Sequence, residues 1–90
     1  MDREKILIKL IELLIKKYGI SENILISRNY DKPLTGNIFN LDGISLTYLF
    51  FDIQKEYNLR FNAEQILNYE FNTINGIVDL IGKCINQEVA

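Results

Sequence analysis

Few side chains in this sequence have the chemistry of an active site. It contains one cysteine, Cys84, and no histidine, which removes most metal sites, the Cys/His and Ser/His pairs of nucleophilic catalysis, and any internal disulfide. Cys84 stands at helical spacing from Leu80 and Ile81, which favours a small buried side chain over a reactive thiol. The carboxylates Asp42 and Asp52 lie almost three helical turns apart, and their spacing suggests no reaction. The sequence therefore predicts a protein that is not an enzyme.

Length and charge narrow the class of protein further. The chain has 90 residues, 48% of them hydrophobic, which suits one small domain with a core over residues 1–90. Ten basic and twelve acidic residues leave a net charge of -2, and the scattered Lys and Arg residues predict no nucleic-acid partner. Lys9 and Glu12 interrupt the first apolar run well before the roughly 20 residues that a membrane span needs. Without a signal peptide or disulfides, a cytoplasmic protein is expected.

The first part of the chain predicts one helix and one long connection. Apolar residues recur every three or four positions over residues 2–18, and Gly19 follows as a stop signal. Residues 20–41 lack a sustained period, and we expect a long loop there with one short helical turn near residues 21–26. The apolar residues expected to hold this loop against the core are Ile24, Leu25, Leu34, Ile38 and Phe39.

The pair Asp42-Gly43 admits two interpretations. Asp-Gly between hydrophobic residues is a strong hairpin signal, and the flanking sequence alternates in part. In a helix, Asp42 would instead be the N-cap and Gly43 the first helical residue. The helix is favoured because the apolar residues that follow step by three and four, at Leu46, Leu49, Phe50, Ile53 and Tyr57.

Two further helices complete the predicted domain. Asn62 would cap a short one with the sequence AEQILNY, and Asn72 or Thr73 would cap a longer one. The buried stripe of the longer helix would consist of Ile74, Ile77, Val78, Leu80, Ile81 and Ile85. The sequence thus predicts an all-α domain of four helices, with a long loop between the first and the second.

This order of elements, with the stretches LDGISLTYLFFDIQKEYNLRF and NYEFNTINGIVDLI, resembles the acyl carrier and peptidyl carrier protein family over most of the chain. The resemblance implies an acyl-carrier-protein-like four-helix bundle. In that family an Asp-Ser-(Leu/Ile) signature begins the second helix, and its serine carries a 4′-phosphopantetheine arm. Residues 53–57 match the family's ending of this helix. Counted back from Tyr57, the signature aspartate falls on Asp42, and Gly43 occupies the serine position.

Gly43 separates this chain from the family's chemistry. Attachment of the arm needs a side-chain oxygen that attacks the pyrophosphate of coenzyme A, and glycine has none. No cofactor is therefore expected. Ser45 lies two residues farther on, about 200° around the helix, so its hydroxyl would face away from the family's site. Its expected place is the third position of the helix, near the free N–H groups.

The resemblance also implies a surface for partner proteins on the second helix. In the family this surface is usually acidic, whereas here the exposed positions would hold Ile44, Thr47, Tyr48 and Phe51. An apolar, aromatic patch on an exposed helix face is typical of a protein contact, so these four are the predicted partner-binding residues. The alternative is that Tyr48 or Phe51 packs under the long loop as part of the core.

A subgroup of carrier-related proteins, which this chain resembles through KPLTGNIFNLDGISLTYLFFDI, is associated with bacterial pathways that mature bacteriocin-like peptides. The resemblance implies a non-enzymatic adaptor or scaffold without the phosphopantetheine site, whose partners are pathway enzymes or a precursor peptide. The alternative is a genuine acyl or peptidyl carrier protein, with a 4′-phosphopantetheine arm, whose serine has been replaced by Gly43. Either protein is expected to be a monomer or a weak dimer.

Overall fold

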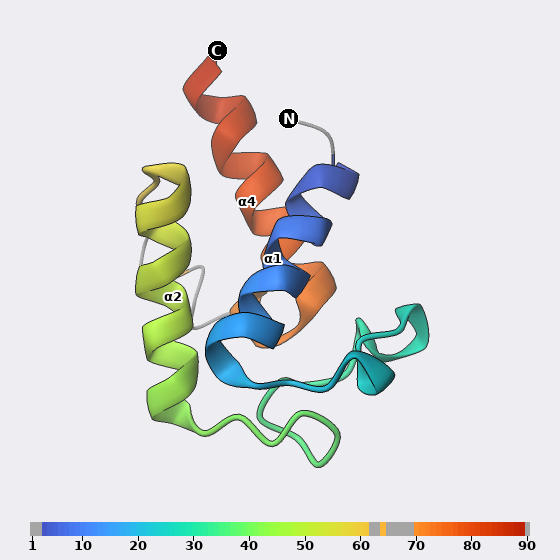
Figure 1. The fold of residues 1–90 in the computed structure, drawn as a ribbon. Helices are drawn as coiled ribbons and strands as arrows, with labels where there is room; N and C mark the ends of the chain where they lie inside the picture. The colour runs from blue at the N-terminus through green and yellow to red at the C-terminus, as the bar shows by residue number, and fades with distance from the viewer. Residues whose placement is uncertain (1–2, 62–63, 65–69, 90) are drawn as a thin grey trace.

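The computed structural model describes residues 3–61, 64 and 70–89, and these residues form helices and turns without any strand (Figure 1). The predicted all-α class is confirmed for this part of the chain. The short helix predicted over AEQILNY falls on residues 63–69, all but Glu64 of which lie outside the described residues, as does its predicted cap Asn62. The described elements are α1 (Arg3–Tyr18), η1 (Glu22–Ile24), η2 (Ser27–Asn29), α2 (Gly43–Tyr57), η3 (Glu70–Asn72) and α4 (Ile74–Val89).

Helix α1 ends where the sequence predicts. Gly19 takes a φ of +66°, a left-handed conformation that costs glycine little and ends helices. The N–H of Ile20 then donates to the carbonyl of Leu14 over 3.1 Å, which folds the chain back against the end of the helix. Because Ile20 is itself buried, the chain leaves α1 along the core.

Side chains from the three long helices meet in one core. The buried residues are Ile6, Leu10 and Leu14 from α1 and Leu49 and Ile53 from α2. The predicted stripe of α4 is confirmed, with Ile74, Ile77, Val78, Leu80 and Ile81 buried and Ile85 partly buried. Helices α1 and α4 pack against each other, while α2 forms one side of the molecule in Figure 1. The long loop crosses the end of this assembly and leads into α2.

The long loop is held in place partly as predicted. The predicted helical turn is η1, which begins after Ser21, and a second turn, η2, follows it. Leu25, Leu34 and Phe39 are buried. The prediction for Ile38 is wrong, because its side chain is 37% exposed. The chain turns sharply here, with the N–H of Asn40 bonded to the carbonyl of Gly36 at 2.9 Å. Adjacent residues in such a turn face different ways, and Phe39 takes the inward position.

Backbone hydrogen bonds fasten the loop to η3 and to the start of α4, where the N–H of Asn75 donates to the carbonyl of Tyr30 over 3.0 Å. The N–H of Leu34 donates to the carbonyl of Asn72 over 2.8 Å, and the N–H of Leu41 donates to the carbonyl of Leu34 over 3.0 Å. Leu41 is the last residue before the N-cap of α2 and is buried. The beginning of α2 is therefore positioned by contacts that run back to η3, which lies directly before α4.

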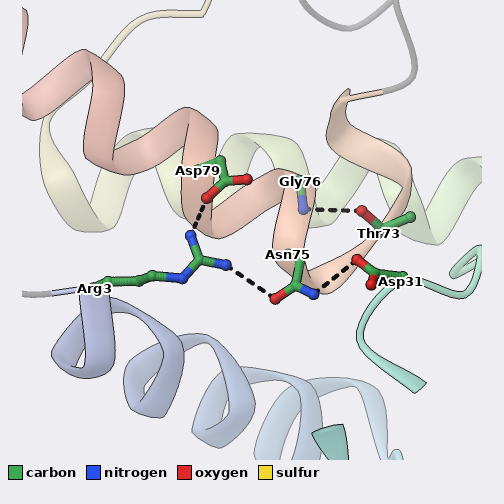
Figure 2. Close-up of polar contacts among 6 residues, drawn as sticks. All are labelled: Arg3, Asp31, Thr73, Asn75, Gly76 and Asp79. Carbon is green, nitrogen blue, oxygen red and sulfur yellow. Dashed lines mark hydrogen bonds and ion pairs between the residues drawn. The ribbon is translucent and has the colours of Figure 1, made fainter. Parts of the chain in front are cut away.

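Side chains reinforce this junction (Figure 2). Asn75 accepts a hydrogen bond from Arg3 over 3.0 Å and donates one to Asp31 in the loop over 2.8 Å. Arg3 also pairs with Asp79, one turn farther along α4. Thr73 caps α4, because its hydroxyl oxygen accepts from the N–H of Gly76 at 2.9 Å. Of the two caps that the sequence allows, the structure thus selects threonine.

Candidate functional site

Helix α2 begins at Gly43 and has Asp42 as its N-cap. The backbone of Asp42 is extended, with φ -89° and ψ 172°, and its Oδ1 accepts a hydrogen bond of 2.6 Å from the N–H of Ser45. This bond stabilises the charged carboxylate and holds the pKa of Asp42 below its usual range. The predicted helix start is confirmed, and the hairpin interpretation of Asp42-Gly43 is wrong.

Gly43 is exposed in the first turn of α2 and has free space around it. A Cβ atom built on Gly43 would meet no neighbouring heavy atom within 4 Å, and the φ of Gly43 is not positive. Neither sterics nor backbone conformation therefore requires glycine here. Ser45 differs in its surroundings, since it is partly buried and its N–H is bonded to Asp42. The exposed position at the helix start consequently carries no hydroxyl.

The four predicted partner-binding residues all lie at the surface. Ile44, Tyr48 and Phe51 are 68%, 60% and 56% exposed, and Thr47 is exposed beside them. The alternative that Tyr48 or Phe51 packs under the loop is wrong. Because Ile44, Tyr48 and Phe51 are spaced by four and three residues, they form one line along the helix. We call Ile44, Tyr48 and Phe51 the apolar row.

Aromatic packing supports one end of the apolar row. The ring of Phe51 meets the ring of Phe50 edge to face, with centroids 5.4 Å apart. Phe50 in turn lies 5.5 Å from each of the rings of Phe61 and Phe71, and both of these are buried. Edge-to-face contacts of this kind orient the rings they join, so the exposed Phe51 is held by the core.

Asp52, the second carboxylate considered from the sequence, faces α1. Its Oδ1 accepts from Nζ of Lys17 and its Oδ2 from the hydroxyl of Tyr18, each over 2.6 Å. Burial raises the pKa of Asp52, but the two hydrogen bonds and the positive charges of Lys17 and Lys55 together hold it below the usual range. Burial, with the bond to Asp52, raises the pKa of Tyr18. Asp42 lies about 15 Å away along the helix axis, so the two carboxylates are not brought together.

The structure also shows a cleft of about 570 Å³ between α1 and α2, which sequence analysis missed. Lys9 and Glu56 form an ion pair of 2.8 Å within it. Apart from this pair, its walls are Leu10, Glu12, Leu13, Lys16, Lys17, Asp52, Lys55 and Tyr57. No sequence pattern pointed to the cleft, because charged residues on two separate helices are also what ordinary solvent-facing surfaces contain.

Other kinds of site were sought in the described part of the chain. No three His, Cys, Asp or Glu side chains gather there in a group that could hold a metal ion. Cys84 is buried, as its spacing predicts. None of the helices within these residues has the length and apolar character needed to cross a membrane. Comparison of the chain with protein-family models, curated proteins and solved structures gives no match.

Proposed function

We propose that this chain is an acyl-carrier-like four-helix bundle without a phosphopantetheine site, and that it acts as a non-enzymatic adaptor for enzymes of a peptide-maturation pathway. The observation that carries the proposal is the start of α2. Asp42 caps the helix and Gly43 follows it, exposed and without a side-chain oxygen. The apolar row begins at the next residue. At the position where carrier proteins bear an attached arm, this chain would thus present a surface for protein contacts.

Several features support the carrier-like fold. All regular elements among the described residues are helices, and a long loop separates α1 from α2. The loop is fastened to α4, so that it delivers Asp42 to the exposed start of α2. An aspartate at this place, directly before the first helical residue, is what the resemblance to carrier proteins implies.

The adaptor role is supported by the chemistry of the surface. No charged residue stands between Asp42 and Asp52, so the acidic contacts typical of carrier proteins have no counterpart along most of α2. Large apolar and aromatic side chains supply much of the binding energy in protein interfaces, and the apolar row contains an isoleucine, a tyrosine and a phenylalanine. A partner enzyme or precursor peptide with an apolar contact surface would fit this face.

The absence of an arm is tested by incubating the chain with coenzyme A and a phosphopantetheinyl transferase of broad specificity, and then measuring its intact mass. The expected result is an unchanged mass, because Gly43 offers no nucleophile. A genuine carrier protein that contains serine in this position is the positive control. A gain of one phosphopantetheinyl group by the unmodified chain would contradict the proposal and would direct attention to Ser45 or another hydroxyl.

The adaptor role is tested by affinity capture from the source cells, with the captured proteins identified by mass spectrometry. The test variant is Tyr48→Glu/Phe51→Glu. The control variant is Ile8→Glu/Ile26→Glu, which adds the same charge at two exposed isoleucines outside the apolar row. We expect the wild type and the control to capture the same maturation enzyme and the test variant to lose it. Identical captures by all three would contradict a docking role for the apolar row.

A further inference from the structure

We propose that the cleft between α1 and α2 binds a small molecule with one anionic group on an apolar body, of the class of aromatic carboxylates. The anionic group lies between Lys16 on α1 and Lys55 on α2, and the apolar body lies against Leu10 and Leu13. The site shares no residue with the apolar row, so this proposal goes beyond the adaptor role and does not depend on it.

The cleft has the size of a small-molecule site, and its walls are held in place. Its volume of about 570 Å³ lies within the roughly 300–1,000 Å³ typical of ligand pockets. One ion pair across it joins Lys9 of α1 to Glu56 of α2 over 2.8 Å. A second joins Lys17 of α1 to Asp52 of α2 over 2.6 Å. Because α1 and α2 are clasped at both pairs, the cleft exists before any ligand enters it.

These two pairs leave Lys16 and Lys55 without a carboxylate. Both are exposed and line the cleft, and neither forms an ion pair with another residue in the described part of the chain. Lys16 directly precedes Lys17, and Lys55 lies three residues after Asp52 on the same face of α2. The long, flexible side chain of lysine can adjust to a ligand. An anionic group beside the Lys17–Asp52 pair would thus meet one free ammonium group from each wall.

The balance of charge in the cleft favours a single anionic group. Its described lining residues include four lysines and three carboxylates, and a cleft with an excess of one charge attracts the opposite one. The carboxylate outside the two ion pairs is Glu12, which lies three residues after Lys9 and four before Lys16. Glu12 would repel an anion and limits the charge that the cleft accepts.

The apolar side chains of the cleft lie deeper than its charges. Leu10 is buried and Leu13 is half-buried, whereas Lys16 and Lys55 are exposed. Both leucines belong to the wall formed by α1, within two turns of Lys16. A ligand with an apolar body can therefore cover the leucines while its anionic group stays at the mouth. Pockets that combine apolar walls with a few charged groups bind molecules of this kind.

Titration with naphthoate, followed through the backbone amide chemical shifts of the chain, tests the site. We expect saturation with a dissociation constant on the order of 1 mM or below and the largest shifts at Leu13, Lys16 and Lys55. Acetate, which lacks the apolar body, and naphthalenemethanol, which lacks the charge, should each bind at least about five-fold more weakly. Three results would overturn the proposal: no saturation by about 10 mM, equal binding of naphthalenemethanol, or shifts centred on Tyr48.

Substitutions test the role of the charges. Lys16→Gln/Lys55→Gln should raise the dissociation constant of naphthoate at least about five-fold, because both free ammonium groups are lost. The control Lys32→Gln/Lys83→Gln removes two exposed lysines outside the cleft and should change it less than about two-fold. Glu12→Gln should tighten binding, which a loss of folding would not do.

Equal affinities of the wild type and Lys16→Gln/Lys55→Gln, or an equal loss in the control, would overturn the proposal. So would weaker binding by Glu12→Gln. The capture of a maturation enzyme is measured separately and involves none of these residues. A cleft that does not bind naphthoate would therefore leave the adaptor role standing, and a failed capture would leave the cleft site standing.

Discussion

The hydroxyl of Tyr18 donates a hydrogen bond of 2.6 Å to Oδ2 of Asp52, which joins the last residue of α1 to the middle of α2. Lys17 donates to the other carboxylate oxygen from the same turn of α1. These bonds hold α2 in one rotation about its axis, in which Ile44, Tyr48 and Phe51 are exposed. Asp52 thus contributes to the candidate site through the orientation of the helix.

Asp52→Asn should lower the free energy of unfolding at pH 7 by about 1 kcal/mol, since charged hydrogen bonds are lost from a partly exposed site. The folded protein lowers the pKa of Asp52, so its stabilisation is complete above the unfolded value near 3.9 and is lost as the pH falls through the folded pKa. Urea unfolding of both proteins from about pH 7 to about pH 2 measures this. The difference in unfolding free energy between the two proteins should vanish in acid. A difference that stays constant with pH would contradict stabilisation by the charged Asp52.

Asn75→Ala should lower the free energy of unfolding by about 1 kcal/mol, because Asn75 bridges Arg3 and Asp31 across three segments of the chain. The matched control is Asn37→Ala, which changes an exposed asparagine in the long loop and should have little effect. Chemical unfolding of both variants gives the comparison. If both variants lose the same free energy of unfolding, the Asn75 bonds in Figure 2 add no more stability than an exposed asparagine of the loop.

Asp42→Ala should lower the melting temperature by about 4–8 °C, the change expected when a domain of this size loses a helix cap. Asp42→Asn keeps a capping side chain and should lower the melting temperature by less. Since the pKa of Asp42 is lowered by its bond to Ser45, the loss in Asp42→Ala should also shrink as the pH falls below about 4. Thermal melts at two pH values measure both effects, and identical melting of wild type and Asp42→Ala would contradict the cap.

Much of this architecture could be predicted because it is local. The end of α1 follows from the stop at Gly19, the start of α2 from the cap at Asp42, and the course of both helices from apolar spacing, all of which act over a few residues. The exposure of Tyr48 and Phe51 follows from the same period, since the opposite face of α2 holds the buried Leu49 and Ile53.

The remaining contacts depend on which distant segments meet. Arg3 pairs with Asp79, which lies 76 positions farther along the chain, and a helical period carries no information about such pairings. Ile38 was misplaced for a related reason. In a loop without periodicity, hydrophobicity alone does not decide which of two neighbours faces inward, and the backbone turn selects Phe39.

Tyr57→Phe should stabilise the fold. The hydroxyl oxygen of Tyr57 is buried and has no hydrogen-bond partner among the residues described, and a buried polar group left unpaired costs about 1–3 kcal/mol. Phenylalanine keeps the ring and removes this cost, so the melting temperature should rise by a few degrees. Tyr48→Phe is the control, because Tyr48 is exposed and its hydroxyl is free to bond with water. A lower melting temperature of Tyr57→Phe would show that its hydroxyl is bonded.

Gly43→Ser should be accepted without loss of stability. The space around Gly43 is open and its φ is not positive, and serine loses less backbone entropy than glycine in a helix. Asp42 and its bond to Ser45 would remain. Thermal unfolding measures the effect, and a clearly lower melting temperature would contradict the open surroundings of Gly43.

The same variant tests whether the start of α2 has the form of the carrier-type site that we propose. If it does, a phosphopantetheinyl transferase should add one phosphopantetheinyl group to Gly43→Ser and none to Gly43→Ala, because only the first has the oxygen nucleophile. Intact mass measures the addition. A folded Gly43→Ser chain that stays unmodified would show that the missing hydroxyl is not the sole difference from carrier proteins. The contacts that a transferase needs would then also be missing from the face that holds Ile44 and Tyr48.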